Sequence, residues 1–268
     1  TERNRYLKYC FAHSVRCYVS PKISDIILMG SERIHLFDTP LLVSRNMGLA
    51  VDQRAAKRVM DILISGIGII ITSPIMLIIA IAVKAYDRGP VFYFQDRLTL
   101  GGKPFKICKF RSMCVDSEKN GARLASKHDS RITPVGHVLR NLHLDELPQL
   151  FNVFKGDMSL VGPRPERESI MLEYEKELPE FYYRLKVKAG LTGYAQVYGK
   201  YNTTPYDKLK LDLFYIENYS FLLDVKLIFM TVKIFFQKEV SEGVDDKQVN
   251  ALKDSGRNTG ASEDKTEE

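Results

Sequence analysis

The longest uninterrupted apolar stretch of the chain runs from Ile62 to Val83 and carries no charged residue over its 22 positions. A helix needs about 20 apolar residues to match the hydrocarbon core of a bilayer. The alternative is a buried core helix of a soluble domain, where uncharged runs of this length are uncommon. The stretch therefore predicts a helix that enters a membrane.

Ser73 and Pro74 lie near the middle of this stretch. Proline removes a backbone donor and clashes with the preceding turn, and a serine hydroxyl beside it can bond a freed carbonyl. Basic residues flank both ends of the stretch, namely Arg54, Lys57 and Arg58 before it and Lys84 and Arg88 after it. Because basic residues favour the cytoplasmic side, the pattern favours a re-entrant hairpin that turns at Ser73 and Pro74 over a simple span.

Shorter patterns predict a mixed body after the apolar stretch. We expect strands at 25–29, 41–43, 91–95 and 105–111, and helices at about 145–155, 166–178 and 205–236. Lys226 and Lys233 interrupt apolar faces of the last helix, which suits an interfacial amphipathic helix and a core helix equally. The predicted fold class is α+β: mostly helical and monotopic, with the re-entrant hairpin, a small β-sheet and amphipathic interfacial helices.

The same patterns divide the chain into four parts. Residues 1–50 are expected to be the remnant of a preceding soluble domain with its linker, and 51–88 to form the basic lead-in and membrane hairpin. Residues 89–240 are expected to form the catalytic domain. Residues 241–268 are polar and poor in apolar side chains, which predicts a disordered tail.

Charge is unevenly distributed along the chain. The formal net charge is +6, but residues 241–268 hold eight acidic and four basic residues, so the rest carries about +10. A basic body suits an anionic partner, whether nucleic acid, a phosphorylated substrate or an anionic bilayer, and also suits a plain soluble surface. The four cysteines show neither metal-type nor disulfide-rich spacing, which fits a reducing, cytoplasmic setting.

An acidic pair, Asp145 and Glu146, precedes apolar residues at helical spacing. Pro148 is compatible with that helix only in its first turn. We therefore expect Asp145 at or near the N-cap, where the helix dipole keeps it ionised and attracts phosphate. The alternative is that the pair only caps the helix.

Cations near this pair in the sequence favour chemistry over capping. Arg140 precedes the pair, Arg164 lies in a stiff Gly-Pro-Arg-Pro loop, and Lys109 and Arg111 alternate along a predicted strand. Arginine grips phosphate bidentately, and such a set suits a pyrophosphate substrate. The adjacent carboxylates of Asp145 and Glu146 could also bind Mg²⁺.

Ordered motifs over about two-thirds of the chain resemble the bacterial sugar transferase family of monotopic polyprenyl-phosphate phosphoglycosyl transferases. They are Lys57-Arg58 to Asp61, Ser73-Pro74, FKICKFRSM at 105–113, LDELPQLFNV at 144–153, KGDMS at 155–159, VGPRP at 161–165 and GLTGYAQV at 190–197. The chain departs from the family pattern at Leu98-Thr99, Ser112, Ala189 and Tyr194.

The resemblance implies an enzyme of the bacterial inner membrane with its catalytic domain on the cytoplasmic face. It would move a sugar 1-phosphate from a UDP-sugar to undecaprenyl phosphate and release UMP, as the first membrane step of exopolysaccharide, capsule, O-antigen or glycoprotein glycan synthesis. Asp145 would form an aspartyl-phosphosugar, with Glu146 as base or metal ligand and Mg²⁺ as cofactor. The substrate phosphates would be bound by Lys109, Arg111, Arg140, Arg164 and Arg97.

Two other functions fit the residues themselves. One is a membrane-anchored scaffold that binds phosphorylated partners without turnover, and the other is a metal-dependent lipid head-group transferase or phosphodiesterase. Nucleic acid is excluded as a partner because it leaves the apolar stretch without a role. Self-association into a homo-oligomer is left open.

Overall fold

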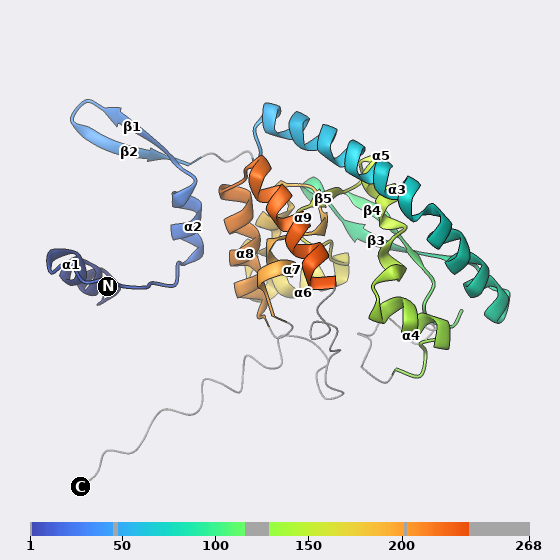
Figure 1. Cartoon of the computed structure of the whole chain (residues 1–268). Helices are drawn as coiled ribbons and strands as arrows, with labels where there is room; N and C mark the ends of the chain where they lie inside the picture. The colour runs from blue at the N-terminus through green and yellow to red at the C-terminus, as the bar shows by residue number, and fades with distance from the viewer. Residues whose placement is uncertain (1, 45–47, 116–128, 201–202, 236–268) are drawn as a thin grey trace, which may run out of the picture.

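The computed structural model describes residues 2–44, 48–115, 129–200 and 203–235, and within them the chain is mostly helical (Figure 1). The helices are α1 (Glu2–Ala12), α2 (Ile23–Met29), α3 (Val51–Asp87), α4 (Pro134–Asn141), α5 (Gln149–Lys155), α6 (Glu168–Glu177), α7 (Tyr194–Tyr198), α8 (Pro205–Glu217) and α9 (Phe221–Phe235). Three 3-10 helices join them: η1 (Leu100–Gly102), η2 (Leu144–Glu146) and η3 (Pro179–Lys186). The predicted 241–268 tail lies outside the described residues.

Six strands form three two-stranded sheets in the described part of the chain. β1 (Glu32–Leu36) and β2 (Thr39–Val43) are antiparallel, as are β3 (Phe92–Leu98) and β4 (Pro104–Phe110), whereas β5 (Ser159–Val161) and β6 (Gly190–Thr192) are parallel. The mostly helical class with small sheets is confirmed. The strands predicted at 41–43, 91–95 and 105–111 correspond to β2, β3 and β4.

The long apolar helix α3 lies along one side of the body, and both of its ends contact that body (Figure 1). Its inner face buries residues at spacings of three to four, as a helix packed on one side requires: Lys57, Met60, Asp61, Ser65, Met76, Ile79 and Val83. Its outer face exposes large apolar side chains: Ile62, Leu63, Ile67, Ile70, Ile71, Leu77, Ile78 and Ile81. Among the described residues, α3 is the one helix long and apolar enough to cross a membrane.

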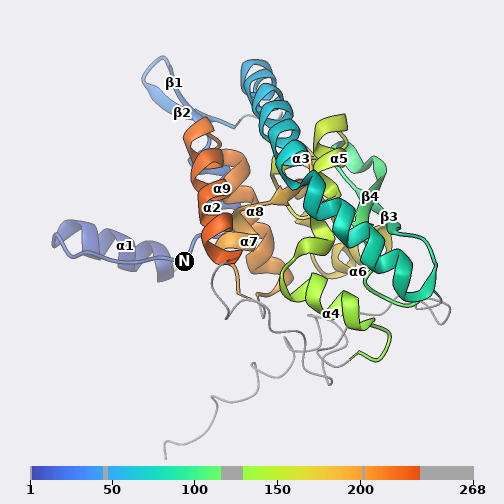
Figure 2. The same cartoon turned by 45° about the vertical axis from the view of Figure 1, so that its right-hand side comes forward.

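The turn predicted at Ser73 and Pro74 takes the form of a bend. The helix continues through Pro74, and Figure 2 shows it changing direction near its middle without reversing. Pro74 cannot donate to the carbonyl of Ile70, four residues earlier. The hydroxyl of Ser73 donates to that carbonyl at 2.8 Å instead, and Thr72 donates to the carbonyl of Gly68 at 2.7 Å. These side-chain bonds satisfy carbonyls in the turn before Pro74, so the helix is not interrupted.

The N-terminal end of α3 docks through buried polar groups. Lys57 donates to Asp224 on α9 at 2.5 Å and to the hydroxyl of Tyr215 on α8 at 3.0 Å. Asp61 accepts from the Ser159 hydroxyl at 3.0 Å and the Leu160 amide at 2.9 Å. Lys57 therefore joins the N-terminal end of α3 to α8 and α9, and Asp61 joins it to β5.

The main core lies between the β3–β4 hairpin, α5, the β5–β6 pair and helices α8 and α9. Its buried side chains include Phe105, Ile107, Leu150, Val153, Met158, Val161, Leu213 and Leu227. β5 and β6 run parallel and so close that a Cβ added to Gly190 would lie 2.1 Å from the amide nitrogen of Gly162. Because the strands are parallel, their carboxyl ends lie at the same edge of the sheet. Arg164 follows β5 there, and Tyr194 follows β6.

Two sequence expectations about helices and strands are wrong. The strand predicted at 25–29 is helix α2, whose start is capped by Asp25 accepting from the Lys22 amide at 2.8 Å. Ile26 from this helix is 1% exposed and belongs to the main core. The core thus extends N-terminal to the boundary predicted at residue 50.

The helix predicted at 205–236 is broken into α8 and α9. The Asn218 side chain donates to the carbonyl of Phe214 at 2.9 Å and the Ser220 hydroxyl accepts from the Leu223 amide at 3.1 Å, so each end has its own cap. α9 buries Leu227 and Asp224 and exposes Phe221, Leu222, Phe229 and Val232. It combines a core face with an exposed apolar face, so the expectation of a core helix is confirmed in part and that of an interfacial helix stays a prediction.

Candidate active site

The acidic pair lies in a 3-10 turn, and the prediction that Asp145 caps an α-helix is wrong. η2 contains Asp145 and Glu146, whereas α5 starts only at Gln149 with Pro148 before it. His143 enters the turn in the left-handed region with φ of 52°. Because Pro148 has no amide hydrogen, the tight turn and the helix do not merge into one element. The carboxylates consequently project from a tight turn instead of a helix N-terminus.

Glu146 is held by two cations from distant parts of the chain. Lys109 on β4 donates to its Oε1 at 2.6 Å, and Arg164 from the loop after β5 donates to the same oxygen at 2.9 Å. Burial favours the protonated carboxyl, but the charges of Arg164 and Lys109 outweigh it and hold the pKa of Glu146 well below its ordinary value. Glu146 is therefore ionised throughout the neutral range.

Asp145 has a different environment. Burial raises the pKa of its carboxyl, Lys109 opposes that shift, the neighbouring charge of Glu146 adds to it, and Arg140 and His143 oppose it. The expected helix start at Asp145 is wrong, because α5 begins at Gln149, and burial is the largest influence on the pKa of Asp145. Among the described residues, none donates a side-chain hydrogen bond to this half-buried carboxylate, which leaves its oxygens available to a ligand.

The predicted phosphate-binding cations divide into two groups. Lys109 and Arg164 meet at Glu146, and Arg140, in the last turn of α4, is close enough to lower the pKa of Asp145. Arg111 instead pairs with Asp87 at the end of α3 and is 7% exposed. β4 ends at Phe110, so the strand alternation that predicted Lys109 and Arg111 on one face stops before Arg111.

Arg97 is also directed into the protein. Its guanidinium donates to the carbonyl of Pro165 at 3.1 Å and to Gln95 at 2.6 Å, and lies 3.8 Å from Glu166. Burial lowers its pKa, opposed mainly by Glu166. Arg97 and Arg111 are therefore engaged in internal contacts, and these positions do not favour their predicted assignment to substrate phosphate.

Sequence reasoning missed Asn152, which connects α5 to β4. Its side-chain carbonyl accepts from the Cys108 amide at 2.9 Å and its amide donates to the Lys106 carbonyl at 2.8 Å, as a neighbouring strand would. These contacts place the turn before α5 beside Lys109. A buried asparagine gives no sequence signal of this kind, because its partners are backbone atoms more than 40 residues away.

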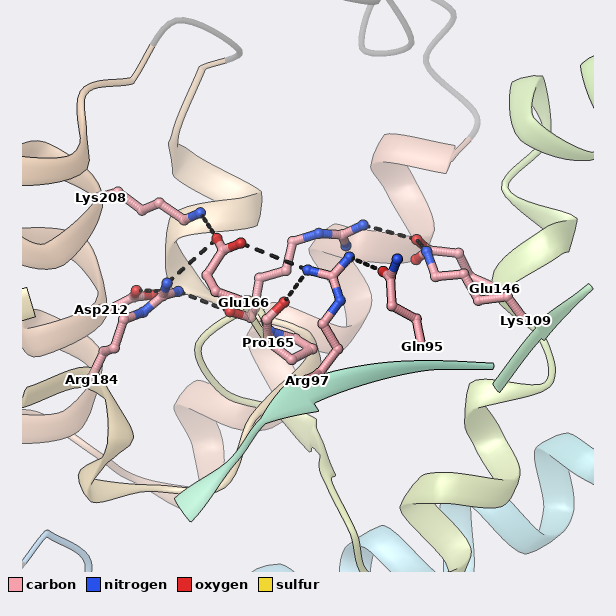
Figure 3. A network of polar contacts seen from close by, with 10 residues as sticks. Gln95, Arg97, Lys109, Glu146, Pro165, Glu166, Arg184, Lys208 and Asp212 are labelled. Carbon is pink, nitrogen blue, oxygen red and sulfur yellow. Dashed lines mark hydrogen bonds and ion pairs between the residues drawn. The ribbon is translucent and has the colours of Figure 1, made fainter. Parts of the chain in front are cut away.

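Sequence reasoning also missed a second set of charges that continues from the site. Figure 3 shows Glu146 and Lys109 at one end and Lys208, Arg184 and Asp212 at the other, with Arg97, Pro165 and Glu166 between them. Glu166 is contacted by Lys208, by Arg184 at 3.5 Å and by Arg97 at 3.8 Å. Burial opposes ionisation, but these cations, Lys208 first, lower the pKa of Glu166 to about 2.

The acidic pair supplies few protein ligands for a metal. Over the described ranges, no three His, Cys, Asp or Glu residues form a metal-ligand cluster. Mg²⁺ is commonly bound by one or two carboxylates together with water and substrate phosphates. Asp145, with its free carboxylate oxygens, and the unpaired oxygen of Glu146 fit that mode, and they do not fit a site made of protein ligands alone.

Comparison with known proteins gives a consistent result. Residues 52–238 match the family described as bacterial sugar transferase. The chain is 40% identical over 235 residues to a UDP-N-acetylgalactosamine-undecaprenyl-phosphate N-acetylgalactosaminephosphotransferase of Aeromonas hydrophila, which covers 87% of this chain and 55% of that relative. It is 43% identical over 208 residues to a UDP-glucose:undecaprenyl-phosphate glucose-1-phosphate transferase of Klebsiella pneumoniae, covering 76% of this chain and 43% of the relative.

A third relative is matched by this chain over most of its own length. It is a UDP-glucose:undecaprenyl-phosphate glucose-1-phosphate transferase of Caulobacter vibrioides, 37% identical over 229 residues, covering 81% of this chain and 84% of the relative. The chain otherwise spans about half the length of the first two relatives. The names of these relatives differ in the sugar and agree on the undecaprenyl phosphate acceptor.

Proposed function

This chain belongs to the bacterial sugar transferase family, and we propose that it transfers a sugar 1-phosphate from a UDP-sugar to undecaprenyl phosphate, releasing UMP. The observation that carries the proposal is the pairing of Asp145, whose carboxylate is free of described hydrogen-bond donors, with Glu146, which is bridged by Lys109 and Arg164. A carboxylate beside two cations suits attack on a pyrophosphate. The printed names of the relatives support both substrates.

The first step forms a covalent intermediate on Asp145. A carboxylate oxygen attacks the β-phosphorus of the UDP-sugar, and the bond from that phosphorus to the oxygen bridging the α-phosphate breaks. UMP leaves with the electron pair, and the sugar phosphate stays on Asp145 as an acyl phosphate. Lys109 and Arg164 stabilise charge that develops on the phosphoryl oxygens.

The second step releases the sugar phosphate to lipid. An oxygen of undecaprenyl phosphate attacks the same phosphorus, the bond to the Asp145 oxygen breaks, and the products are undecaprenyl diphosphate sugar and a restored carboxylate. We propose that Glu146 either holds metal or accepts a proton from the acceptor, and its strongly lowered pKa makes it a weak base and so favours the first role. Bound Mg²⁺, held by Asp145, Glu146 and substrate phosphates, would neutralise charge and favour the ionised carboxyl of Asp145.

We propose that α3 is monotopic and re-entrant, with both ends on the cytoplasmic face of the inner membrane. Its N-terminal part is bound to α8 and α9 through Lys57, and its C-terminal part packs Ile79 and Val83 against Leu139 and Phe110. Because both parts pack on the same folded body, a helix that crossed the bilayer would carry part of that body, with its polar backbone, into lipid, which is costly. The bend at Pro74 and the outward apolar face suit a helix that dips into one leaflet.

The membrane proposal is tested by labelling single cysteines placed at Val51 and at Tyr86, in a background without Cys10, Cys17, Cys108 and Cys114. Both sites should react with a membrane-impermeant maleimide in inside-out vesicles and be protected in right-side-out cells. Opposite protection of the two sites would establish a full span and contradict the re-entrant placement.

The catalytic proposal is tested by UMP release from a panel of UDP-sugars, in nanodiscs with and without undecaprenyl phosphate. One donor should support sustained release with acceptor and a single turnover without it. Mass spectrometry of the donor-only reaction should find the sugar phosphate on Asp145. Release without an adduct would favour a direct metal-dependent transferase, and no release from any donor would favour a binding scaffold.

A further inference from the structure

The backbone of the loop that carries Arg164 is bound at three consecutive carbonyls. Arg184 on η3 donates to the carbonyl of Arg164 at 3.0 Å, Arg97 on β3 donates to that of Pro165 at 3.1 Å, and the Leu98 amide donates to that of Glu166 at 3.0 Å. Two of these three donors are arginine side chains from elements far apart in the sequence. The direction in which Arg164 leaves the loop therefore depends on those arginines.

The same two arginines converge on the carboxylate of Glu166. Arg184 is 2% exposed and Arg97 is 19% exposed, so their charges are poorly solvated. With Lys208 they place three positive charges around one carboxylate, as Figure 3 shows. Buried like charges repel strongly unless an opposite charge lies between them. Glu166 supplies that charge, and Asp212 pairs with Arg184 on its far side at 2.8 Å.

We propose that Glu166 is a positioning residue for Arg164, holding Arg97 and Arg184 on the loop so that the Arg164 guanidinium stays aimed at Glu146 and at the donor pyrophosphate. The proposal rests on the proposed function for its substrate. A fixed loop lowers the entropy lost when Arg164 engages phosphate, so its stiffness contributes to donor affinity. The ionisation of Glu166 at neutral pH keeps the arrangement constant during turnover.

The central test is Glu166→Gln, with donor KM and kcat measured separately by UMP release. If Glu166 positions Arg164, donor KM rises about tenfold, in the range found for residues that orient direct ligands. A residue that only stabilises the fold would reduce the folded fraction, which lowers apparent kcat and leaves KM unchanged. An unchanged KM would overturn the proposal.

A double-mutant cycle with Arg164→Ala tests whether the effect passes through Arg164. Glu166→Gln should change kcat/KM by less than about twofold in the Arg164→Ala background, because residues that act as a unit are not additive. A full tenfold effect in that background would contradict the assignment. Asp224→Asn is the matched control, since it removes a buried carboxylate from Lys57 and Tyr215 and should leave donor KM unchanged.

Two further measurements keep the test decisive. Should Glu166→Gln fail to fold, Lys208→Gln removes one partner of Glu166 from a partly exposed position, and a smaller rise in donor KM is expected. Hydrogen exchange without donor should be faster across 162–168 in the Glu166 or Lys208 variant and unchanged in Asp224→Asn. Unchanged exchange in that segment would overturn the positioning role. If the wild type releases no UMP, the proposed function fails. Hydrogen exchange across 162–168 still decides whether Glu166 holds the loop that carries Arg164.

Discussion

Glu146 and Glu166, two of the carboxylates in the network of Figure 3, are buried to a similar extent in different surroundings. Their side chains are 16% and 13% exposed, and cations depress the pKa of both. The cations differ. Arg164 beside Glu146 is 44% exposed, whereas Arg184 beside Glu166 is 2% exposed and also bonds the backbone. The comparison indicates that the cluster at Glu146, whose cation Arg164 is accessible to solvent, is the better candidate for binding phosphate.

The largest effect should come from Asp145→Asn. The amide keeps the size of the side chain and cannot form an acyl phosphate, so UMP release should fall by about 10³-fold or more. The measurement is steady-state UMP release, with circular dichroism in detergent to confirm folding. Retention of more than a tenth of the activity would show that Asp145 is not the nucleophile and would favour direct transfer by a metal-dependent transferase.

Arg164→Ala and Arg111→Ala compare a cation that solvent and substrate can reach, Arg164, with a buried one, Arg111. Loss of Arg164 is expected to lower kcat/KM about 10²-fold, chiefly by raising donor KM, because it removes a phosphate ligand. Loss of Arg111 strands the partly buried Asp87 and should destabilise the fold by about 3 kcal/mol without changing donor KM. Denaturant titration and donor saturation curves measure the two effects. A larger KM effect from Arg111 would reverse their assignment.

Stability should depend on acid through Glu166. Its pKa falls from an ordinary 4.5 to about 2 in the folded chain, so the folded state favours the ionised carboxylate. The stabilisation is complete above about pH 4.5 and is lost as the pH falls toward 2, amounting to about 3 kcal/mol at most. Comparing Glu166→Gln with wild type by denaturant titration at pH 6 and pH 3 should show the difference between them shrinking at pH 3. An equal difference in the free energy of unfolding at the two pH values would contradict a pKa of about 2 for Glu166.

The smallest effect is expected at an exposed ion pair. Lys155 is 76% exposed and lies 3.2 Å from Asp157, so Lys155→Ala should change the free energy of unfolding by less than about 0.5 kcal/mol. It should leave donor KM unchanged. This variant sets the baseline for the other four variants, and a loss above about 1 kcal/mol would show that exposure is a poor guide to ion-pair energies in this protein.

The sequence alone predicted the apolar helix, the β3–β4 hairpin and the acidic pair with Lys109, Arg140 and Arg164 around it. These features depend on local periodicity, on residue type and on ordered motifs, which are readable without contacts. It did not predict the 3-10 turn at Asp145, the break between α8 and α9, or helix α2. The turn depends on the backbone of His143 and on Pro148, the break depends on side-chain caps at Asn218 and Ser220, and α2 depends on the packing of Ile26 in the core. Apolar periodicity along the chain reveals none of these.

The sequence by itself thus determined which charged groups exist and that an uncharged helix of 22 or more residues precedes them. Only the tertiary structure decided that Arg97 and Arg111 face inward, that Lys109 and Arg164 converge on Glu146, and that Glu166 has three cationic partners. The physical reason is that charge–charge energies depend on distance and solvent exposure. Both quantities are set by which elements pack together and cannot be obtained from spacing along the chain.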